Sequence, residues 1–160
     1  MVTMRVPRTV LAVAAELSLG AVATADDLPP LRTPALLGWL HAGTHRATYV
    51  GEPAVHSSAS AHGMHVRTWY APRLAEDLRA GRPSFRRGAA MVKELYFDGN
   101  DEVIGWSVMR KVRARSGGGR GWFFFETLDG ARAIARGRGA SVCVGCHRAG
   151  ADFLLSPFRP

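Results

Sequence analysis

The sequence predicts a mainly β fold of the α+β class, in which an antiparallel sheet is accompanied by a few short helices. Two observations support this prediction. Runs rich in β-branched and aromatic residues recur between residues 65 and 127, and two of them flank Asp98-Gly99-Asn100-Asp101, a sequence typical of a hairpin turn. The helical patterns elsewhere are short, and the chain of 160 residues contains no repeat or heptad pattern. We therefore expect a single domain.

The first segment has the features of a secretory signal. Two arginines precede an apolar run over residues 10–22, and the small residues at 23–25 form a cleavage site. The run is short for a membrane span and a glutamate interrupts it. We predict a signal peptide over residues 1–25, a mature domain over residues 26–160 in the periplasm, and no stable membrane insertion after cleavage.

Three short helices are expected in the mature chain. Thr33 followed by Pro34 is typical of an N-cap and a first helical position. Pro72 opens a second helix, which Gly81 ends, and Ser141 is expected to cap a last helix near the C-terminus.

Strands are expected wherever branched and aromatic residues gather between turn residues. The predicted strands cover residues 65–70, 89–97, 103–112 and 122–127. The second and third form a β-hairpin, and Asp129-Gly130 predicts a further turn after the fourth.

The net charge is +8, but the arginines are scattered along the chain instead of gathered on one segment. A scattered basic surface does not indicate nucleic-acid binding, which uses a basic patch or stripe. It is compatible with an acidic redox partner or with small anions.

The two cysteines of the chain lie in one motif, Cys143-Val144-Gly145-Cys146-His147. This is the attachment pattern of c-type haem. Two thiols one helical turn apart can add to the two vinyl groups of a porphyrin, and the adjacent imidazole can then bind the iron. The motif predicts one covalent haem c, held by Cys143 and Cys146, with His147 as the metal ligand.

Two other interpretations of the motif remain open. A redox disulfide would suit an exported protein, although such a motif normally follows an early strand in a βα unit. A structural zinc ion would need a fourth ligand, and five histidines could supply it. These are His41, His45, His56, His62 and His65.

No methionine follows His147, so a methionine ligand on the second side of the iron would have to come from upstream. The candidates are Met64, Met91 and Met109. Methionines more often fill a protein core than bind a metal. An iron bound by His147 alone would leave an open face, which favours ligand binding or catalysis over simple electron transfer.

Three further segments accompany the motif: Val66-Arg67-Thr68-Trp69-Tyr70, Met91-Val92-Lys93-Glu94-Leu95, and Gly121-Trp122-Phe123-Phe124-Phe125. Together they resemble the cytochrome P-460 family, which includes the related cytochromes c′-beta. The resemblance covers roughly residues 64–158. It implies an antiparallel β fold, a homodimer, and a five-coordinate haem iron that either oxidises hydroxylamine or binds nitric oxide.

The resemblance also implies roles for two side chains. Lys93 matches a lysine that bonds covalently to the haem, and Arg67 matches an arginine near the distal face or a propionate. Alternation along a strand places Lys93 with Met91 and Leu95, so that it is either directed at a specific group or extends from an edge. The chain has only two lysines, and arginine cannot supply a nucleophilic amine.

At one position the sequence departs from the family. The resemblance implies a distal glutamate where Ser107 stands, so Glu94 or Glu126 would have to accept protons instead. Alternatively, Phe97 or Trp106 would cap the iron, as in gas-binding members. The sequence therefore leaves three functions open: a hydroxylamine oxidase with an external redox partner, a gas-binding protein, and an electron-transfer cytochrome whose sixth ligand is one of the methionines or histidines.

Overall fold

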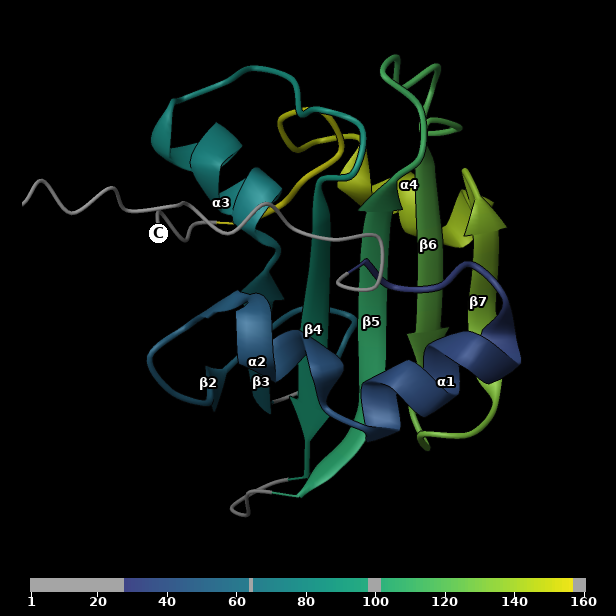
Figure 1. Ribbon diagram of the computed structural model, residues 1–160. Coiled ribbons are helices and arrows are strands. Elements are labelled where there is room, and N and C mark those ends of the chain that lie inside the picture. The colour runs from purple at the N-terminus through teal and green to yellow at the C-terminus, as the bar shows by residue number, and fades with distance from the viewer. Residues whose placement is uncertain (1–27, 64, 98–101, 157–160) are drawn as a thin grey trace, which may run out of the picture.

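The computed structural model describes residues 28–63, 65–97 and 102–156 (Figure 1). Within these ranges the helices are α1 (Thr33–His41), α2 (Thr44–Thr48), α3 (Pro72–Arg79) and α4 (Ser141–His147). The strands are β1 (Val50–Gly51), β2 (His56–Ser57), β3 (His65–Tyr70), β4 (Ala90–Tyr96), β5 (Val103–Lys111), β6 (Trp122–Thr127) and β7 (Ala133–Arg138).

One antiparallel sheet contains all seven of these strands. Strands β3 to β7 lie side by side in chain order, and the short strands β1 and β2 both pair with the outer edge of β3. The predicted fold class, an antiparallel sheet with a few short helices, is thereby confirmed. The cysteine motif lies on the last helix, as the sequence indicates.

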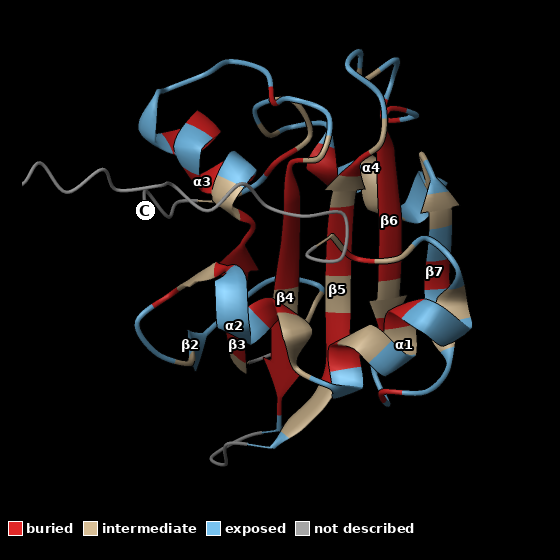
Figure 2. Ribbon diagram, in the orientation of Figure 1, coloured by how far each residue is buried: buried red, intermediate tan, exposed pale blue. Residues whose placement is uncertain are grey.

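Helices cover both faces of the sheet. In Figure 1, α1 and α2 lie in front of it and α4 lies behind β6 and β7. The front core joins Leu36 and Leu40 of α1 to Val92 and Phe125 of the sheet. The rear core joins Leu74 of α3 to the rear face of the same strands and includes the partly buried Cys143 of α4. The central strands are therefore enclosed between two layers, and Figure 2 shows β4 and β6 buried along most of their length.

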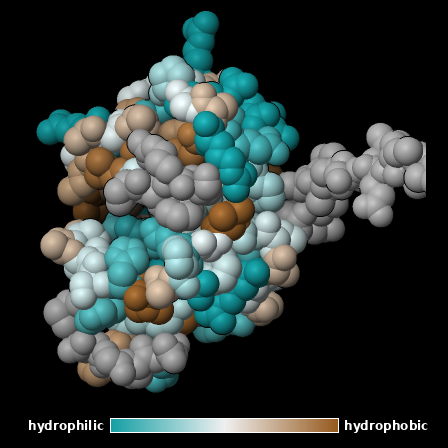
Figure 3. Space-filling model, turned by 90° about the vertical axis from the view of Figure 1, so that its left-hand side faces the viewer, coloured by the Kyte–Doolittle hydropathy of each residue, from teal (hydrophilic) through white to brown (hydrophobic). Residues whose placement is uncertain are grey.

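The surface seen from the α3 side is mainly hydrophilic, with separate hydrophobic patches (Figure 3). Among the described residues no helix is long and apolar enough to cross a bilayer. The expected signal peptide over residues 1–25 and the hairpin turn over residues 98–101 lie outside the described residues.

The structure corrects two helix N-caps. Helix α1 begins at Thr33 itself, with Arg32 as its N-cap. Helix α4 begins at Ser141, one residue earlier than expected, and its N-cap Ala140 makes no side-chain cap hydrogen bond. Neither the Thr33 nor the Ser141 hydroxyl caps its helix, so the backbone conformation at Arg32 and Ala140 marks where α1 and α4 begin. Strands β1, β2 and β7 and helix α2 are additional to the predicted elements.

Candidate functional site

A row of three partly exposed residues crosses the rear face of the sheet. Lys93 of β4 pairs with Ser107 of β5, which pairs with Glu126 of β6. Lys93 is the only partly exposed residue of β4, and Glu126 is the only one of β6. The neighbouring row, Met91, Met109 and Phe124, is fully buried beneath α3 and α4. The rear covering is therefore open at the polar row.

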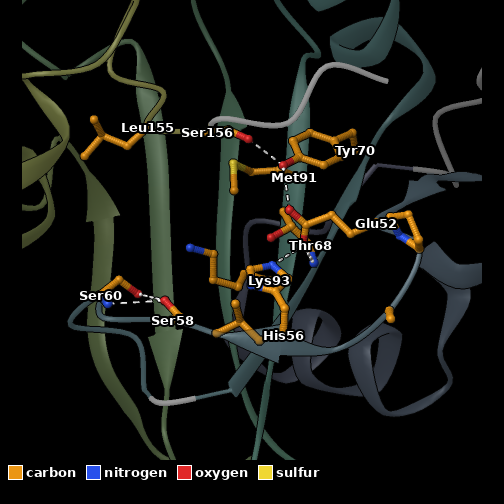
Figure 4. A pocket seen from close by; sticks show the side chains of 13 residues that line it. Glu52, His56, Ser58, Ser60, Thr68, Tyr70, Met91, Lys93, Leu155 and Ser156 are labelled. Atoms are coloured by element: carbon orange, nitrogen blue, oxygen red, sulfur yellow. Dashed lines mark hydrogen bonds and ion pairs between the residues drawn. The ribbon is translucent and has the colours of Figure 1, made fainter.

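A pocket of about 560 Å³ lies over the β4 end of this row. Figure 4 shows the Lys93 side chain extending into it, with Ser58 and Ser60 on one side and Leu155 on the other. Among the described residues, no group lies within hydrogen-bond or ion-pair distance of the Lys93 amine. Burial lowers its pKa from the ordinary value, although the negative charges of Glu52 and Glu126 act in the opposite direction. Lys93 therefore presents an unpaired and readily deprotonated amine to the pocket.

His147 ends α4 and lies over β6, where its ring centre is 5.6 Å from that of Phe124. Its Nδ1 lies 2.9 Å from the backbone carbonyl oxygen of Phe153, to which it can donate. Burial lowers its pKa, which favours the neutral imidazole that binds metals. Metal-ligating histidines usually make such a hydrogen bond with one ring nitrogen and leave the other for the metal. Nε2 of His147 is therefore the nitrogen available for a metal.

The segment that orients His147 is itself fixed to the sheet. The amine of Lys111, on β5, pairs with the carboxylate of Asp152 and donates to Ser116 at 2.5 Å. Lys111 is 1% exposed and its amine lies 5.0 Å from the ring centre of Trp122. This buried ion pair fixes Asp152, the neighbour of Phe153, to the sheet. It gives Lys111, the second lysine of the chain, a structural role.

Both cysteines are free thiols on α4. Residues at i, i+3 and i+4 share one side of a helix, so Cys143, Cys146 and His147 face the same way. Burial raises the pKa of the Cys143 thiol to about 11. Redox-active cysteines of CxxC motifs have lowered pKa values, so this environment does not favour the redox-disulfide interpretation.

His62 joins the site from the loop between β2 and β3. Its Nδ1 lies 2.7 Å from the carboxylate of Glu126, and both side chains are largely buried. Its ring centre is 5.9 Å from that of His147. Sequence reasoning considered His62 only as one of the histidines that could bind zinc or supply a sixth iron ligand, because nothing in the loop sequence indicates a partner 64 residues away.

Arg67 lies on the opposite face, away from Lys93 and His147. In the backbone register of β3 with β4, Arg67 lies opposite Glu94. Its guanidinium carbon lies 4.5 Å from the ring centre of Trp69. Its Nε donates to the backbone oxygen of Glu52 at 2.9 Å. Because side chains alternate along a strand, the neighbouring Thr68 faces the pocket and Arg67 cannot. Arg67 therefore lies on the face of the sheet opposite to Lys93, and its expected position near the distal face or a propionate stays a prediction.

Glu94 also belongs to the front layer, where its carboxylate accepts four hydrogen bonds within the core. The donors are His45 and Arg46 at one oxygen, and Trp69 and Tyr96 at the other. Burial alone would raise its pKa, but these hydrogen bonds lower it to about 2. Glu94 therefore cannot serve the rear site, whereas Glu126 lies directly in it.

The remaining candidates divide between the two faces. Trp106 is buried in the front core and packs against His41, so it does not lie over the rear row. Phe97, at the end of β4, is 62% exposed and lines a separate pocket of about 500 Å³ that His62 also lines. Met91 and Met109 are core residues of the rear face, and Met64 lies outside the described residues. Within the described part of the chain no three His, Cys, Asp or Glu side chains form a group that could hold a metal ion.

These side chains fit a planar, covalently held cofactor better than a bare ion. Two thiols and one imidazole nitrogen share one face of α4, and a pocket of about 560 Å³ over the β4 end of the polar row is lined by Lys93 but by no residue of α4. Pockets for cofactors commonly measure about 300–1,000 Å³. A tetrahedral ion would need a fourth ligand close to the other three.

No protein-family model matches the chain, and a comparison with curated proteins finds no similar sequence. The resemblance to a family therefore rests on the four motifs and their order alone.

Proposed function

We propose that the chain is a periplasmic mono-haem c-type cytochrome whose iron binds or oxidises a small nitrogen compound, hydroxylamine or nitric oxide. Cys143 and Cys146 would hold the porphyrin through thioether bonds, and His147 would bind the iron. The opposite face of the iron would be open to the ligand.

One observation carries this proposal: the common face of α4 presents two thiols and a buried imidazole beside the opening in the rear layer. His147 has its Nδ1 engaged by the Phe153 carbonyl and Nε2 available, as a metal ligand requires. The thiols lie one helical turn apart, which matches the spacing that thioether attachment needs. Each attachment adds S–H across a vinyl C=C bond, so no electrons are lost.

The choice of a nitrogen compound comes from the resemblance to the cytochrome P-460 family. A haem bound by one imidazole supplies a Lewis-acidic iron that accepts electrons from a ligand. Oxidation of hydroxylamine to nitric oxide releases three electrons and three protons, so an external redox partner must take the electrons. In this chain Glu126 and Lys93 are the ionisable side chains of the polar row that could receive protons.

Lys93 is the residue that we propose to bond to the haem edge. Its amine has no partner in the part of the chain that the structure describes, and its lowered pKa increases the neutral, nucleophilic fraction. The bond would replace one N–H and one C–H, releasing two protons and two electrons. Hydrogen peroxide, reduced to two molecules of water, is an oxidant of the required class.

The periplasmic location and the homodimer belong to the same proposal. The location follows from the signal over residues 1–25, and the homodimer follows from the resemblance. Large apolar side chains at the surface would suit a contact between two copies. The most exposed of these on the sheet and its loops are Phe97, Leu128 and Ile134.

The test is ligand binding and turnover by holoprotein made in a host that attaches c-type haem. We expect the optical spectrum to change on addition of nitric oxide or hydroxylamine. If the chain is a hydroxylamine oxidase, Lys93→Arg should abolish turnover and still leave haem attached. Full turnover in Lys93→Arg would reject the role of the crosslink. A haem protein that takes neither ligand would reject the proposed ligand class.

A gas-binding protein is the second candidate, favoured by the replacement of the expected glutamate with Ser107. It predicts reversible binding of nitric oxide, no turnover of hydroxylamine and no lysine crosslink.

A further inference from the structure

We propose that an arginine-rich surface beside the first turn of α4 docks an acidic redox protein, the external partner that takes electrons from the haem. We call this surface the basic collar and define it as Arg113, Arg115, Arg120 and Arg138. The inference rests on the proposed function. It places the redox partner of that function on one side of the molecule and assigns it a negative charge.

The net charge of the mature chain comes from one edge of the sheet. Residues 110–148 contain nine lysines and arginines and only two acidic residues, a difference of +7. The rest of the expected mature chain, residues 26–109 and 149–160, contains ten basic and ten acidic residues. Residues 110–148 form the end of β5, all of β6 and β7, and α4, which lie together at one edge of the sheet (Figure 1). The basic residues are spread along the chain, but the acidic residues that would balance them are scarce at this edge.

The arginines of the basic collar are all exposed, and within the described ranges none of them has an acidic partner. The arginine ion pairs of those ranges involve Arg46 in the front layer and Arg82 and Arg86 beside α3. Asp152, which follows α4, is already paired with the buried Lys111 amine. The positive charge of the collar is therefore not neutralised by the described part of the chain.

Close contacts bring the collar to the start of α4. The connection between β5 and β6 rests on this helix, because a Cβ on Gly119 would lie 2.5 Å from Cγ2 of Val144. A Cβ on Gly139, two residues before the helix, would lie 3.1 Å from Cγ of Arg120. Nε of Arg138 donates to the backbone oxygen of Arg120 at 3.2 Å. Arginines from the β5–β6 connection and from the end of β7 thus meet beside the helix that carries both cysteines.

The first turn of α4 also exposes an apolar side chain. Val142 is 70% exposed, the largest fraction among the exposed large hydrophobic residues of the described chain. Protein interfaces commonly combine an apolar contact with a polar or charged rim. A partner that docks on Val142 and the collar would contact the helix that, in the proposed function, holds both thioether bonds.

An acidic protein is the occupant that these features favour. Opposite charges steer two proteins together and raise association rates by about 10- to 1,000-fold, an effect that salt weakens. Redox encounters are weak and bury less than about 1,200 Å², so a small apolar contact within a charged surface is sufficient. Membrane attachment would instead use a long amphipathic helix, whereas α4 has seven residues.

The test measures electron transfer from reduced holoprotein to oxidised plastocyanin, a small acidic copper protein, by stopped-flow spectroscopy at several salt concentrations. The second-order rate constant should fall as the salt concentration rises. Arg120→Gln combined with Arg138→Gln should lower it about 3- to 10-fold at low salt and have little effect at high salt. Arg73→Gln combined with Arg79→Gln is the matched control, because it removes the same charge from α3, outside the basic edge. It should leave the rate nearly unchanged.

A second pair of variants locates the contact. Val142→Glu adds a negative charge beside the collar and should slow the transfer to plastocyanin by about 10-fold or more at low salt. Leu128→Glu is its control, because Leu128 is also exposed, at 46%, and follows the opposite end of β6. Leu128→Glu should change the rate much less.

Several results would overturn the inference while leaving the haem site intact. These are holoprotein that transfers no electrons to plastocyanin, a rate that does not fall with salt, and equal losses in the collar and control variants. Binding to phosphatidylglycerol vesicles that the collar variant loses, with its electron transfer unchanged, would assign the collar to a membrane and also overturn the inference. Should the collar variant not fold, Arg113→Gln combined with Arg115→Gln decides by the same criteria. Protein without haem would overturn the proposed function, and the inference with it.

Discussion

Glu94→Gln tests the assignment of the Glu94 and Glu126 carboxylates to opposite faces of the sheet, since Glu94 should act only on stability. Each oxygen of Glu94 accepts two hydrogen bonds in the front core, at 2.7–2.8 Å. In glutamine one of these oxygens becomes an NH₂ group, which cannot accept. Two buried donors then lose their acceptor, at about 1–3 kcal/mol each.

The pKa gives a second measure of the same loss. Lowering the pKa of Glu94 from 4.5 to about 2 corresponds to about 3 kcal/mol, at 1.36 kcal/mol per pKa unit. Because the folded-state pKa is the lower one, this stabilisation is complete above the unfolded-state pKa. It disappears as the pH falls from about 5 toward about 2.

Urea titration of the holoprotein, followed by circular dichroism, measures this effect. We expect Glu94→Gln to lower the free energy of unfolding by about 3 kcal/mol at pH 7, equivalent to about 10 °C in Tm. The difference from wild type should shrink at pH 3. Glu76→Gln is the control, because Glu76 is 62% exposed and its surface pair with Arg86 contributes little. A loss below 1 kcal/mol at pH 7, or an equal loss at pH 3, would refute the reasoning.

Two other predictions follow from the rear face. Asp152→Asn removes the charge partner of the buried Lys111 amine, and urea titration should show the free energy of unfolding lowered by about 3–5 kcal/mol. Adding Lys111→Met should recover most of this loss. No recovery would contradict a buried ion pair. In apoprotein, Cys143 should react with iodoacetamide far more slowly than the exposed Cys146, because a thiol of pKa about 11 is only about one part in a thousand thiolate at pH 8. Peptide mass spectrometry measures both rates, and equal rates would contradict the buried environment of Cys143.

Local patterns were sufficient to predict the central strands and the position of the motif. Strands β3 and β6 have the predicted bounds, β4 is one residue shorter than predicted at each end, and β5 is one residue shorter at its C-terminal end. Alternation alone places Lys93 beside Met91 and Leu95, and the structure agrees. Strands β1, β2 and β7 were missed because they are short or rich in small and charged residues. Their pairing with neighbouring strands, not their propensity, makes them strands.

The composition of the site depends on contacts that the sequence does not specify. Arg67 and Lys93 face opposite ways because of the register between β3 and β4, and the helix-containing connection between those strands leaves that register free. The registers of β4 with β5 and of β5 with β6 likewise place Glu94 and Glu126 on opposite faces. His62 and Glu126, like Lys111 and Asp152, meet only through tertiary packing. Spacing in the sequence carries no signal for either pair.

The intact mass of the exported protein, made in a host that matures c-type cytochromes, tests the central claim most directly. We predict the mass of residues 26–160 plus one haem, retained under denaturing conditions, and a further loss of two hydrogens if Lys93 is crosslinked. A folded, colourless protein with the mass of the polypeptide alone would contradict the account.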